Sequence, residues 1–333
     1  MVSESVIEKR YLYIGLILFP SFVFLWAGQF RSIWWLENLT GIPLILIGYY
    51  AFLSVIFLFS APYRFTACTI GLAFIWFFSI PAATYERGES CIKPVSIVQY
   101  NLRYENPDLS AFIEYIRTQP IDLVVLQEVS PGHGEQFRVL DNVYPFQYGG
   151  QGKIGYPSGQ MVLSKNRLYG MSVFRSAYGH KLIRGIWQPN AELDIALYVG
   201  HPPSPRTESL WLARNATMDA LEDLVSLSPL DTTLVVGDFN LSSESHRFKR
   251  MLVEFERQPV RSWPVELAGV QFPKASMIGI DHLWLKSDSK AKYGICHRRA
   301  LLEFEGSDHS PILTVIGKAT TDIYSDAITS PRL

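Results

Sequence analysis

The sequence has 333 residues, of which 48% are apolar, and its 30 basic and 31 acidic side chains give a formal net charge of −1. This length is enough for two or three structural units of about 100 to 200 residues each. A protein that grips long stretches of nucleic acid usually carries an excess of basic residues, so the near-neutral charge counts against that class.

The first 94 residues contain three long segments without any charged residue, at positions 11–30, 38–63 and 65–85. Each is long enough to supply the ~20 residues that a helix needs to cross a bilayer. We expect three transmembrane helices, at about 11–30, 41–60 and 65–85, so that residues 1–94 form a membrane anchor. A cleaved signal peptide has only one short apolar segment, and the anchor is therefore expected to be retained.

The charges that flank the first apolar segment predict the orientation of the chain in the membrane. Lys9 and Arg10 precede this segment, and basic residues favour the cytoplasmic side. Three spans then place the following domain outside the cytoplasm. Cys91 and Cys296 could form a disulfide there or remain free thiols, and the sequence leaves both possibilities open.

After Pro94 the sequence alternates between short apolar strands and amphipathic helices. We expect strands at Val95–Tyr100, Ile121–Leu126, Gln160–Leu163, Asp194–Val199, Thr233–Val236, Ile280–Leu285 and Pro311–Ile316, and helices at Asp108–Gln119, Arg214–Leu227 and Ser243–Arg257. Alternation of this kind indicates an α/β sandwich. Residues 95–318 are expected to form this domain, and residues 319–333 a C-terminal tail.

Polar side chains stand directly after several of the predicted strands. Asn101 follows the first strand and Glu128 follows the second. A carboxylate and an amide are oxygen ligands of the kind that Mg²⁺ or Mn²⁺ prefers. Taken alone, Glu128 could as well be a strand-end acid that faces solvent.

The segment Gly237-Asp238-Phe239-Asn240 is a more specific signal. At strand spacing, Asp238 and Asn240 point to one side and Phe239 points into the core. A carboxylate and an amide would then share one site. The alternative is an ordinary turn rich in Asp and Asn.

Two histidines are candidates for proton transfer. His309, in Ser307-Asp308-His309, has a possible orienting carboxylate in Asp281. His201 begins a proline-rich loop and is the natural partner of His309. Two histidines across a scissile phosphate could position the attacking water and protonate the leaving oxygen.

Five short motifs, taken in order, resemble the motif series of the endonuclease/exonuclease/phosphatase superfamily. They are Gln99-Tyr100-Asn101-Leu102-Arg103, Leu126-Gln127-Glu128, Gly237-Asp238-Phe239-Asn240, Ile280-Asp281-His282 and Ser307-Asp308-His309-Ser310-Pro311. The resemblance implies a two-sheet β-sandwich flanked by helices, in four layers, and metal-assisted hydrolysis of a phosphate ester.

The same resemblance implies a role for each matching residue. Glu128, Asn101 and Asp308 would belong to a site for Mg²⁺ or Mn²⁺, while Asp238 and Asn240 would position water and phosphate. His309 would be the active-site histidine, oriented by Asp281, and His201 would be the second histidine, although the acid that normally pairs with it has no clear equivalent here. Arg214 is expected to face the substrate.

Several predicted membrane spans followed by such a domain also resemble the membrane-bound members linked to vancomycin or teicoplanin resistance. For those, an extracytoplasmic lipid-linked phosphate is the suggested substrate. The expectation is therefore a membrane-anchored, metal-dependent phosphoesterase that hydrolyses a phosphate ester or pyrophosphate of a lipid in the bilayer. The alternatives are a membrane-tethered endonuclease that acts on DNA or RNA, and a membrane scaffold without catalytic activity.

Overall fold

The computed structural model describes residues 4–27, 33–88, 91–267, 269–271, 278–287 and 293–319. The chain divides into two compact units. The first comprises Met1–Pro81 with Leu241–Arg250, and the second comprises Ala82–Asn240 with Met251–Leu333. The predicted tail beyond Ala319, and residues 28–30 of the first predicted span, lie outside the described residues.

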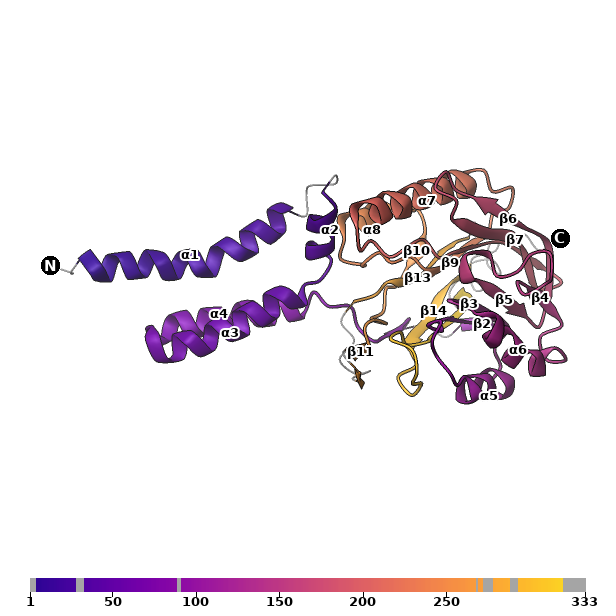
Figure 1. Cartoon of the computed structure of the whole chain (residues 1–333), viewed down its shortest axis with the longest axis horizontal. Coiled ribbons are helices and arrows are strands. Elements are labelled where there is room, and N and C mark those ends of the chain that lie inside the picture. The colour runs from indigo at the N-terminus through magenta and orange to yellow at the C-terminus, as the bar shows by residue number, and fades with distance from the viewer. Residues whose placement is uncertain are drawn as a thin grey trace, which may run out of the picture. The chain divides into compact units, whose positions relative to one another are not determined.

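The first unit consists of helices (Figure 1), namely α1 (Glu4–Ala27), α2 (Trp34–Thr40), α3 (Leu44–Ser60), α4 (Tyr63–Phe77) and the short α8 (His246–Arg250). A thin apolar seam joins α1, α3 and α4, and its buried members are Ile17, Leu53, Phe57 and Phe65. Other large apolar side chains point outward, such as Phe59, which is 84% exposed. The outward faces of these helices are therefore apolar.

Only part of the predicted membrane anchor has the length of a complete span. Residues Ile7–Ala27 of α1 are long and apolar enough to cross a membrane, whereas α2 and α3 reach this length only as a pair bent by 64°. The helix α4 has 15 residues and is shorter than the predicted span 65–85. The prediction was too long because Thr84–Glu86 forms strand β1 instead.

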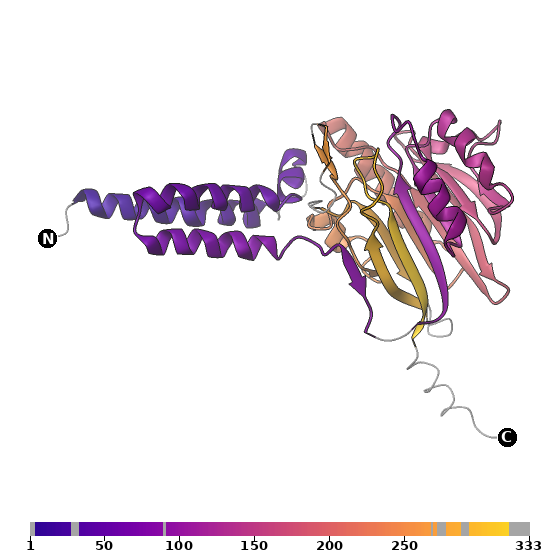
Figure 2. The same cartoon turned by 90° about the horizontal axis from the view of Figure 1, so that it is seen from below.

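The second unit contains two mixed β-sheets (Figures 1 and 2). In spatial order, the seven-stranded sheet consists of β1, β14 (Tyr293–Ala300), β15 (Ile312–Ala319), β2 (Cys91–Asn101), β3 (Leu123–Gln127), β5 (Met161–Ser164) and β4 (Phe146–Tyr148). The six-stranded sheet consists of β10 (Glu256–Arg257), β13 (Asp281–Lys286), β9 (Thr233–Asp238), β8 (Leu193–Gly200), β7 (Lys181–Asn190) and β6 (Arg167–Arg175). A third pair joins β11 (Glu266–Leu267) and β12 (Val270–Gln271).

Each large sheet contains one parallel pair, joined by a helical crossover. The helix α5 (Ser110–Thr118) connects the parallel strands β2 and β3, and α7 (Glu208–Ser226) connects β8 and β9. The short helix α6 (Pro131–Phe137) follows β3 and contributes Phe137 to the cluster that α5 forms with the seven-stranded sheet. The predicted architecture of two mixed sheets flanked by helices is thus confirmed.

The inner faces of the two sheets change from apolar to polar toward one end. On β2, the buried Ile97 is followed at two-residue intervals by Gln99 and Asn101, and on β9 Val236 is followed by Asp238. Because alternate residues of a strand face the same side, these polar groups continue the row of the apolar core. This polar end of the sandwich carries the candidate site.

A disulfide joins Cys91 of β2 to Cys296 of β14, with 6.1 Å between the two Cα atoms. The strand β15 runs between them, and the bridge crosses it at Gly317. A Cβ atom at Gly317 would lie 3.2 Å from the Cβ of Cys91 and 3.3 Å from the Sγ of Cys296. Glycine therefore makes room for the bridge, and the two cysteines that the sequence left open are paired.

Candidate active site

A buried hydrogen-bonded pair of Asp281 and His309 forms the centre of the site. The Nδ1 atom of His309 lies 2.8 Å from Oδ2 of Asp281, and Ser262 Oγ donates to the same oxygen at 2.6 Å. Asp281 begins β13, and His309 lies in the loop before β15. The contact fixes the direction of the imidazole ring and leaves its Nε2 atom to face the site.

The opposite charges of Asp281 and His309 stabilise each other. Burial by itself lowers the pKa of His309, but the negative charges of Asp281 and Asp238 outweigh it and raise the pKa to about 10. Burial also raises the pKa of Asp281, yet the charge of His309 and the hydrogen bonds from His309 and Ser262 bring the pKa below its ordinary value. At neutral pH the pair is therefore an imidazolium and a carboxylate.

Asp238 lies between the two histidines. Its Oδ2 atom is 3.8 Å from Nε2 of His309 and 3.9 Å from Nε2 of His201, and Asn101 Nδ2 donates to it at 2.9 Å. Burial and the charge of Asp281 raise the pKa of Asp238 to about 6. A carboxylate with this pKa can accept a proton near neutral pH.

His201 is held from its other ring nitrogen. Nδ1 lies 3.1 Å from the carbonyl oxygen of Ser158, so that Nε2 faces Asp238 and also lies 3.9 Å from Oε1 of Glu128. Ser158 lies in the short 3₁₀ helix η2 (Pro157–Gly159), which precedes β5. The backbone carbonyl of Ser158 thus stands at Nδ1 of His201, where the family resemblance led us to expect an acid.

Glu128 and Asn101 stand side by side at the ends of the parallel strands β3 and β2. Asn101 Nδ2 donates to Oε1 of Glu128 at 3.2 Å, and its Oδ1 accepts from the backbone N–H of Arg103 at 3.0 Å. Positive φ angles occur at Glu128 (52°), Arg103 (59°) and Ser158 (49°). Strained backbone of this kind is maintained where the surrounding structure fixes a functional geometry.

The other three predicted site residues are Asn240, Arg214 and Asp308. The backbone N–H of Asn240 donates to Oδ1 of Asp238 at 2.8 Å. Asn240 Nδ2 donates to the carbonyl of Pro202 at 3.1 Å. Arg214 was expected to face the substrate, but it is 2% exposed and donates to the carbonyl of Asn240 at 3.1 Å, behind the loop. Asp308 accepts from the indole N–H of Trp263 at 2.9 Å.

The donor set suits a hard cation. Ligand atoms of Asp238, Asp281 and His309 lie within 4.8 Å of one another, and the carboxylate of Glu128 and the amide of Asn101 stand beside this group. Only the oxygen atoms can bind a cation here, because the protonated ring of His309 has no free lone pair. Among the described lysines and arginines, none forms an ion pair with Glu128, Asp238, Asp281 or Asp308. Because carboxylate and amide oxygens are what Mg²⁺ and Mn²⁺ prefer, the site fits a divalent cation.

Three residues that support the site were not among the predicted site residues, namely Ser158, Ser262 and Trp263. Each acts through a hydrogen bond to His201, Asp281 or Asp308. Ser158 begins a segment, Ser158–Ser164, that resembles a strand of the family, but this resemblance does not predict the contact of its carbonyl with His201. Ser262 and Trp263 come from a segment without strand or helix periodicity, so only the tertiary fold brings them to the carboxylates.

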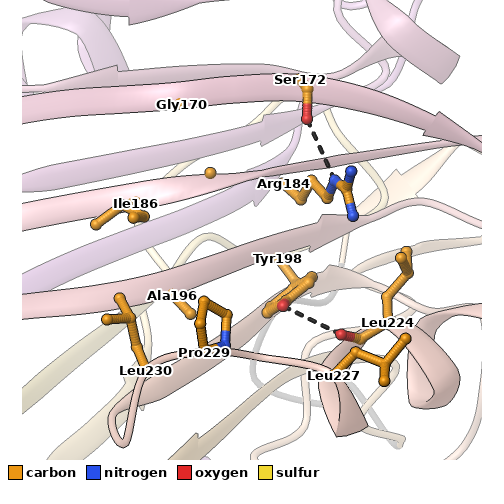
Figure 3. Close-up of a pocket in the computed structure, with 11 residues that line it drawn as sticks. Gly170, Ser172, Arg184, Ile186, Ala196, Tyr198, Leu224, Leu227, Pro229 and Leu230 are labelled. Carbon is orange, nitrogen blue, oxygen red and sulfur yellow. Dashed lines mark hydrogen bonds between the residues drawn. The ribbon is translucent and has the colours of Figure 1, made fainter.

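A separate cavity of about 260 Å³ lies on the outer side of the six-stranded sheet (Figure 3). Strands β6, β7 and β8 and the C-terminal end of α7 line it, and its polar contacts are Arg184 Nε to Ser172 Oγ at 3.3 Å and Tyr198 Oη to the carbonyl of Leu224 at 3.2 Å. Its lining contains no carboxylate and no histidine. It is therefore distinct from the catalytic cluster.

Solved structures share the fold of the second unit. The structure of D. rerio TDP2 complexed with single strand DNA product is 15% identical, with a TM-score of 0.57, and covers 68% of this chain and 100% of that chain. A functionally unknown conserved protein from Enterococcus faecalis V583 is 17% identical, with a TM-score of 0.54 and coverage of 67% and 100%. An endonuclease/exonuclease/phosphatase from Beutenbergia cavernae DSM 12333 is 13% identical, with a TM-score of 0.53 and coverage of 68% and 72%.

Among curated proteins, none has a significant sequence match to this chain. The model of the Endonuclease/Exonuclease/phosphatase family, by contrast, matches residues 98–309, which is more than half of the chain and includes every predicted site residue. The chain therefore belongs to the endonuclease/exonuclease/phosphatase family and is a hydrolase that acts on phosphate ester bonds.

Proposed function

We propose that this protein is a membrane-anchored, metal-dependent phosphoesterase whose substrate is a lipid-linked phosphate or pyrophosphate. The observation that carries the catalytic part is the buried Asp281–His309 pair, which faces Asp238 across 3.8 Å. One imidazolium and one carboxylate with a pKa of about 6 are the acid and the base that hydrolysis at neutral pH needs.

Each residue of the site has its own role in the proposed reaction. Asp238, with Asn240 beside it, orients the attacking water and accepts its proton. His309 holds a positive charge against the phosphate and gives a proton to the leaving oxygen, while Asp281 keeps its ring oriented. His201 positions the water or phosphate from the opposite side of Asp238.

Enzymes of this family generally use divalent metal ions such as Mg²⁺. Glu128, Asn101 and Asp308 are the residues that we assign to a site for Mg²⁺ or Mn²⁺. When bound, the ion supplies Lewis-acid stabilisation of the phosphate oxygens. The excess of carboxylates over permanent cations at this end of the sandwich supports the assignment.

The apolar outer faces of the N-terminal helices support a membrane anchor with several spans. Phe52, Phe59 and Phe78 are 68%, 84% and 81% exposed, and only 17% of the apolar window of α1 is buried. Water-exposed apolar surface of this extent is rare on soluble monomers, whereas lipid covers it without a penalty. We therefore assign α1, α3 and α4 to three membrane segments.

The disulfide supports an extracytoplasmic location of the catalytic domain. Cys91 and Cys296 are paired, and disulfides persist in oxidising compartments such as the periplasm or the cell exterior. The basic residues Lys9 and Arg10, in the N-terminal part of α1, favour the same orientation.

The proposed anchor and the charge support a lipid-linked substrate. The anchor would hold the catalytic domain at the bilayer, and residues 95–333 contain 24 basic and 26 acidic side chains, without a basic excess for nucleic acid. The resemblance to the resistance-linked membrane-bound members points to a polyprenyl phosphate or pyrophosphate.

A second candidate is a membrane-tethered nuclease. D. rerio TDP2, which shares the fold of the second unit, favours this alternative, because its structure contains a single strand DNA product. A protein without catalytic activity is the third possibility, and the complete set of acid, base and carboxylates argues against it.

The test of the substrate class uses the full chain in detergent micelles with Mg²⁺ or Mn²⁺. Phosphate release from a polyprenyl pyrophosphate and from phospholipids is measured beside nicking of plasmid DNA, with His309→Ala as the control. Lipid phosphate release that depends on metal and His309 supports the proposal. Nicking alone assigns the protein to the nucleases, and loss of both activities favours a scaffold.

A further inference from the structure

Arg298 of β14 is fully buried, with 0% of its surface exposed. Burial lowers the pKa of Arg298 to about 9, which is still well above neutral pH, so the guanidinium stays charged. None of the described carboxylates forms an ion pair with it. A charge in the protein interior is unfavourable by several kcal/mol unless other groups compensate it, and the contacts of Arg298 show what does so here.

The strongest contact of Arg298 is with the strand that carries the orienting carboxylate. Its Nη2 atom donates to the backbone carbonyl of Asp281 at 2.8 Å, and Nη1 donates to the carbonyl of Leu283 at 3.4 Å. The neighbouring strand β10 pairs with β13 only at Trp284 and Leu285. Arg298 therefore donates hydrogen bonds to backbone carbonyls of β13 that β10 does not reach, directly behind Asp281.

A second branch runs through Gln99 to the strand of Asp238. Nη2 of Arg298 also donates to Oε1 of Gln99 at 3.4 Å, and Gln99 Nε2 donates to the carbonyl of Gly237 at 3.3 Å. Gly237 immediately precedes Asp238, and Gln99 lies two residues before Asn101 on β2. The two side chains thus connect the strands that present Asn101, Asp238 and Asp281.

Arg298 also places a positive charge near the buried carboxylate of Asp281. Asp238 and Asp281 are each 1% exposed, and His309 is the cation that contacts Asp281 from the substrate side. The negative charge of Asp281 in turn favours the charged guanidinium of Arg298.

We propose that Arg298, together with Gln99, is a buried positioning network that sets the separation of Asp238 from the Asp281–His309 pair and thereby the catalytic rate. This proposal rests on phosphoester hydrolysis at the site above, but not on the lipid nature of the substrate. Both residues lie behind the site, so their removal changes the turnover number rather than the binding of substrate or metal.

The experiment measures hydrolysis of bis(p-nitrophenyl) phosphate with Mn²⁺ by the full chain in detergent micelles. For Arg298→Met we expect kcat to fall by about 100-fold, because a displacement on the order of 1 Å has this effect on an aligned site. KM and the Kd of Mn²⁺, measured by electron paramagnetic resonance, should stay within about threefold. Arg298→Lys keeps the charge but lacks the planar fork of donors, and it should recover only part of kcat.

Arg299→Met is the matched control, because Arg299 is the next residue on β14 and is exposed. It should leave kcat unchanged. Gln99→Met retains Arg298 and tests the same network if Arg298→Met does not fold. We expect this variant to have a lower kcat than the wild type and the same melting temperature. Wild-type kcat in a folded Arg298→Met or Gln99→Met variant, or an equal change in KM and metal affinity, would overturn the proposal.

A readout without turnover separates this proposal from the proposed function. The proton between His309 Nδ1 and Asp281 gives a low-field nuclear magnetic resonance signal in a fixed pair. If the wild type hydrolyses no ester, the proposed function fails. The positioning role then stands if Arg298→Met shifts or loses this signal while Arg299→Met keeps it, and it fails if both variants keep the signal.

Discussion

At the scale of single residues, Asp281 has the largest effect of any neighbour on the protonation of His309. Asp281→Asn removes the largest of the negative charges that raise the pKa of His309, so that only Asp238 and Asp308 remain to oppose burial, which lowers it. The pKa should therefore fall from about 10, and activity that needs the protonated ring should be lost at a lower pH than in the wild type. We also expect kcat at neutral pH to fall by about 100-fold or more.

The pH–rate profile of bis(p-nitrophenyl) phosphate hydrolysis checks this prediction. Asp231→Asn, at an exposed position of the same domain, is the control and should keep the profile of the wild type. An unchanged alkaline limb in Asp281→Asn would show that His309 does not act as a cation in the reaction.

Gly237 is a second position where one residue determines the site. Its φ angle is 152°, and a Cβ atom there would lie 2.0 Å from the carbonyl oxygen of Gly200. Gly237→Ala should therefore separate β8 from β9, lower the free energy of unfolding by about 1–3 kcal/mol and reduce activity, because Asp238 and His201 follow these two glycines.

Thermal unfolding and turnover of the same sample test the effect of Gly237→Ala. Gly152→Ala is the matched control, since a Cβ atom at Gly152 meets nothing within 4 Å. Equal melting temperatures for the two variants would contradict the close approach of the strands.

The sequence identified much of the site because its chemistry sits in motifs at strand ends. Asn101, Glu128 and Asp238 follow apolar strands, and the fold brings them together as the strand pattern predicts. Arg214 was assigned to the substrate side from the family resemblance, which does not tell which face of the helix α7 covers the sheet. Burial and the contact with Asn240 became visible only in three dimensions.

At the scale of elements, the disulfide connects two strands that are not neighbours. It closes a loop with a sequence separation of 205 residues, so chain entropy predicts a contribution to stability of up to about 5 kcal/mol. Cys296→Ser should therefore lower the melting temperature of the oxidised protein, and a reducing agent should have the same effect on the wild type.

Thermal unfolding with and without dithiothreitol checks this expectation. Cys68→Ser, which changes the exposed free cysteine, should leave the melting temperature unchanged. A melting temperature that does not respond to dithiothreitol would argue against a structural role of the bridge.

The strands that could be predicted are those with a continuous apolar run. The strands β3 and β9 are buried along their whole length and read as continuous apolar runs. The edge strand β6 is half exposed, and β14 contains His297, Arg298 and Arg299, so neither has an apolar run and both were missed. The predicted helix Ser243–Arg257 ends at Arg250, because Glu256–Arg257 pairs with β13 as β10.

At the scale of the whole molecule, the proposed anchor and the proposed location predict a defined behaviour in cells. The full chain should stay in the membrane fraction after alkaline carbonate washing, because α1, α3 and α4 expose apolar faces. Protease added to spheroplasts of a bacterial host should digest the catalytic domain. Release by carbonate would contradict the anchor, and protection from protease would reverse the orientation.

Metal-dependent phosphoester hydrolysis at the Asp281–His309 pair can be measured with a simple chromogenic diester. The assay follows the release of p-nitrophenol from bis(p-nitrophenyl) phosphate by the purified full chain, with Mn²⁺ and then with excess EDTA, beside His309→Ala. We predict activity with Mn²⁺ that EDTA abolishes and that falls by at least about 100-fold in His309→Ala. Activity that survives EDTA or the loss of His309 would show that hydrolysis does not depend on a metal or on His309.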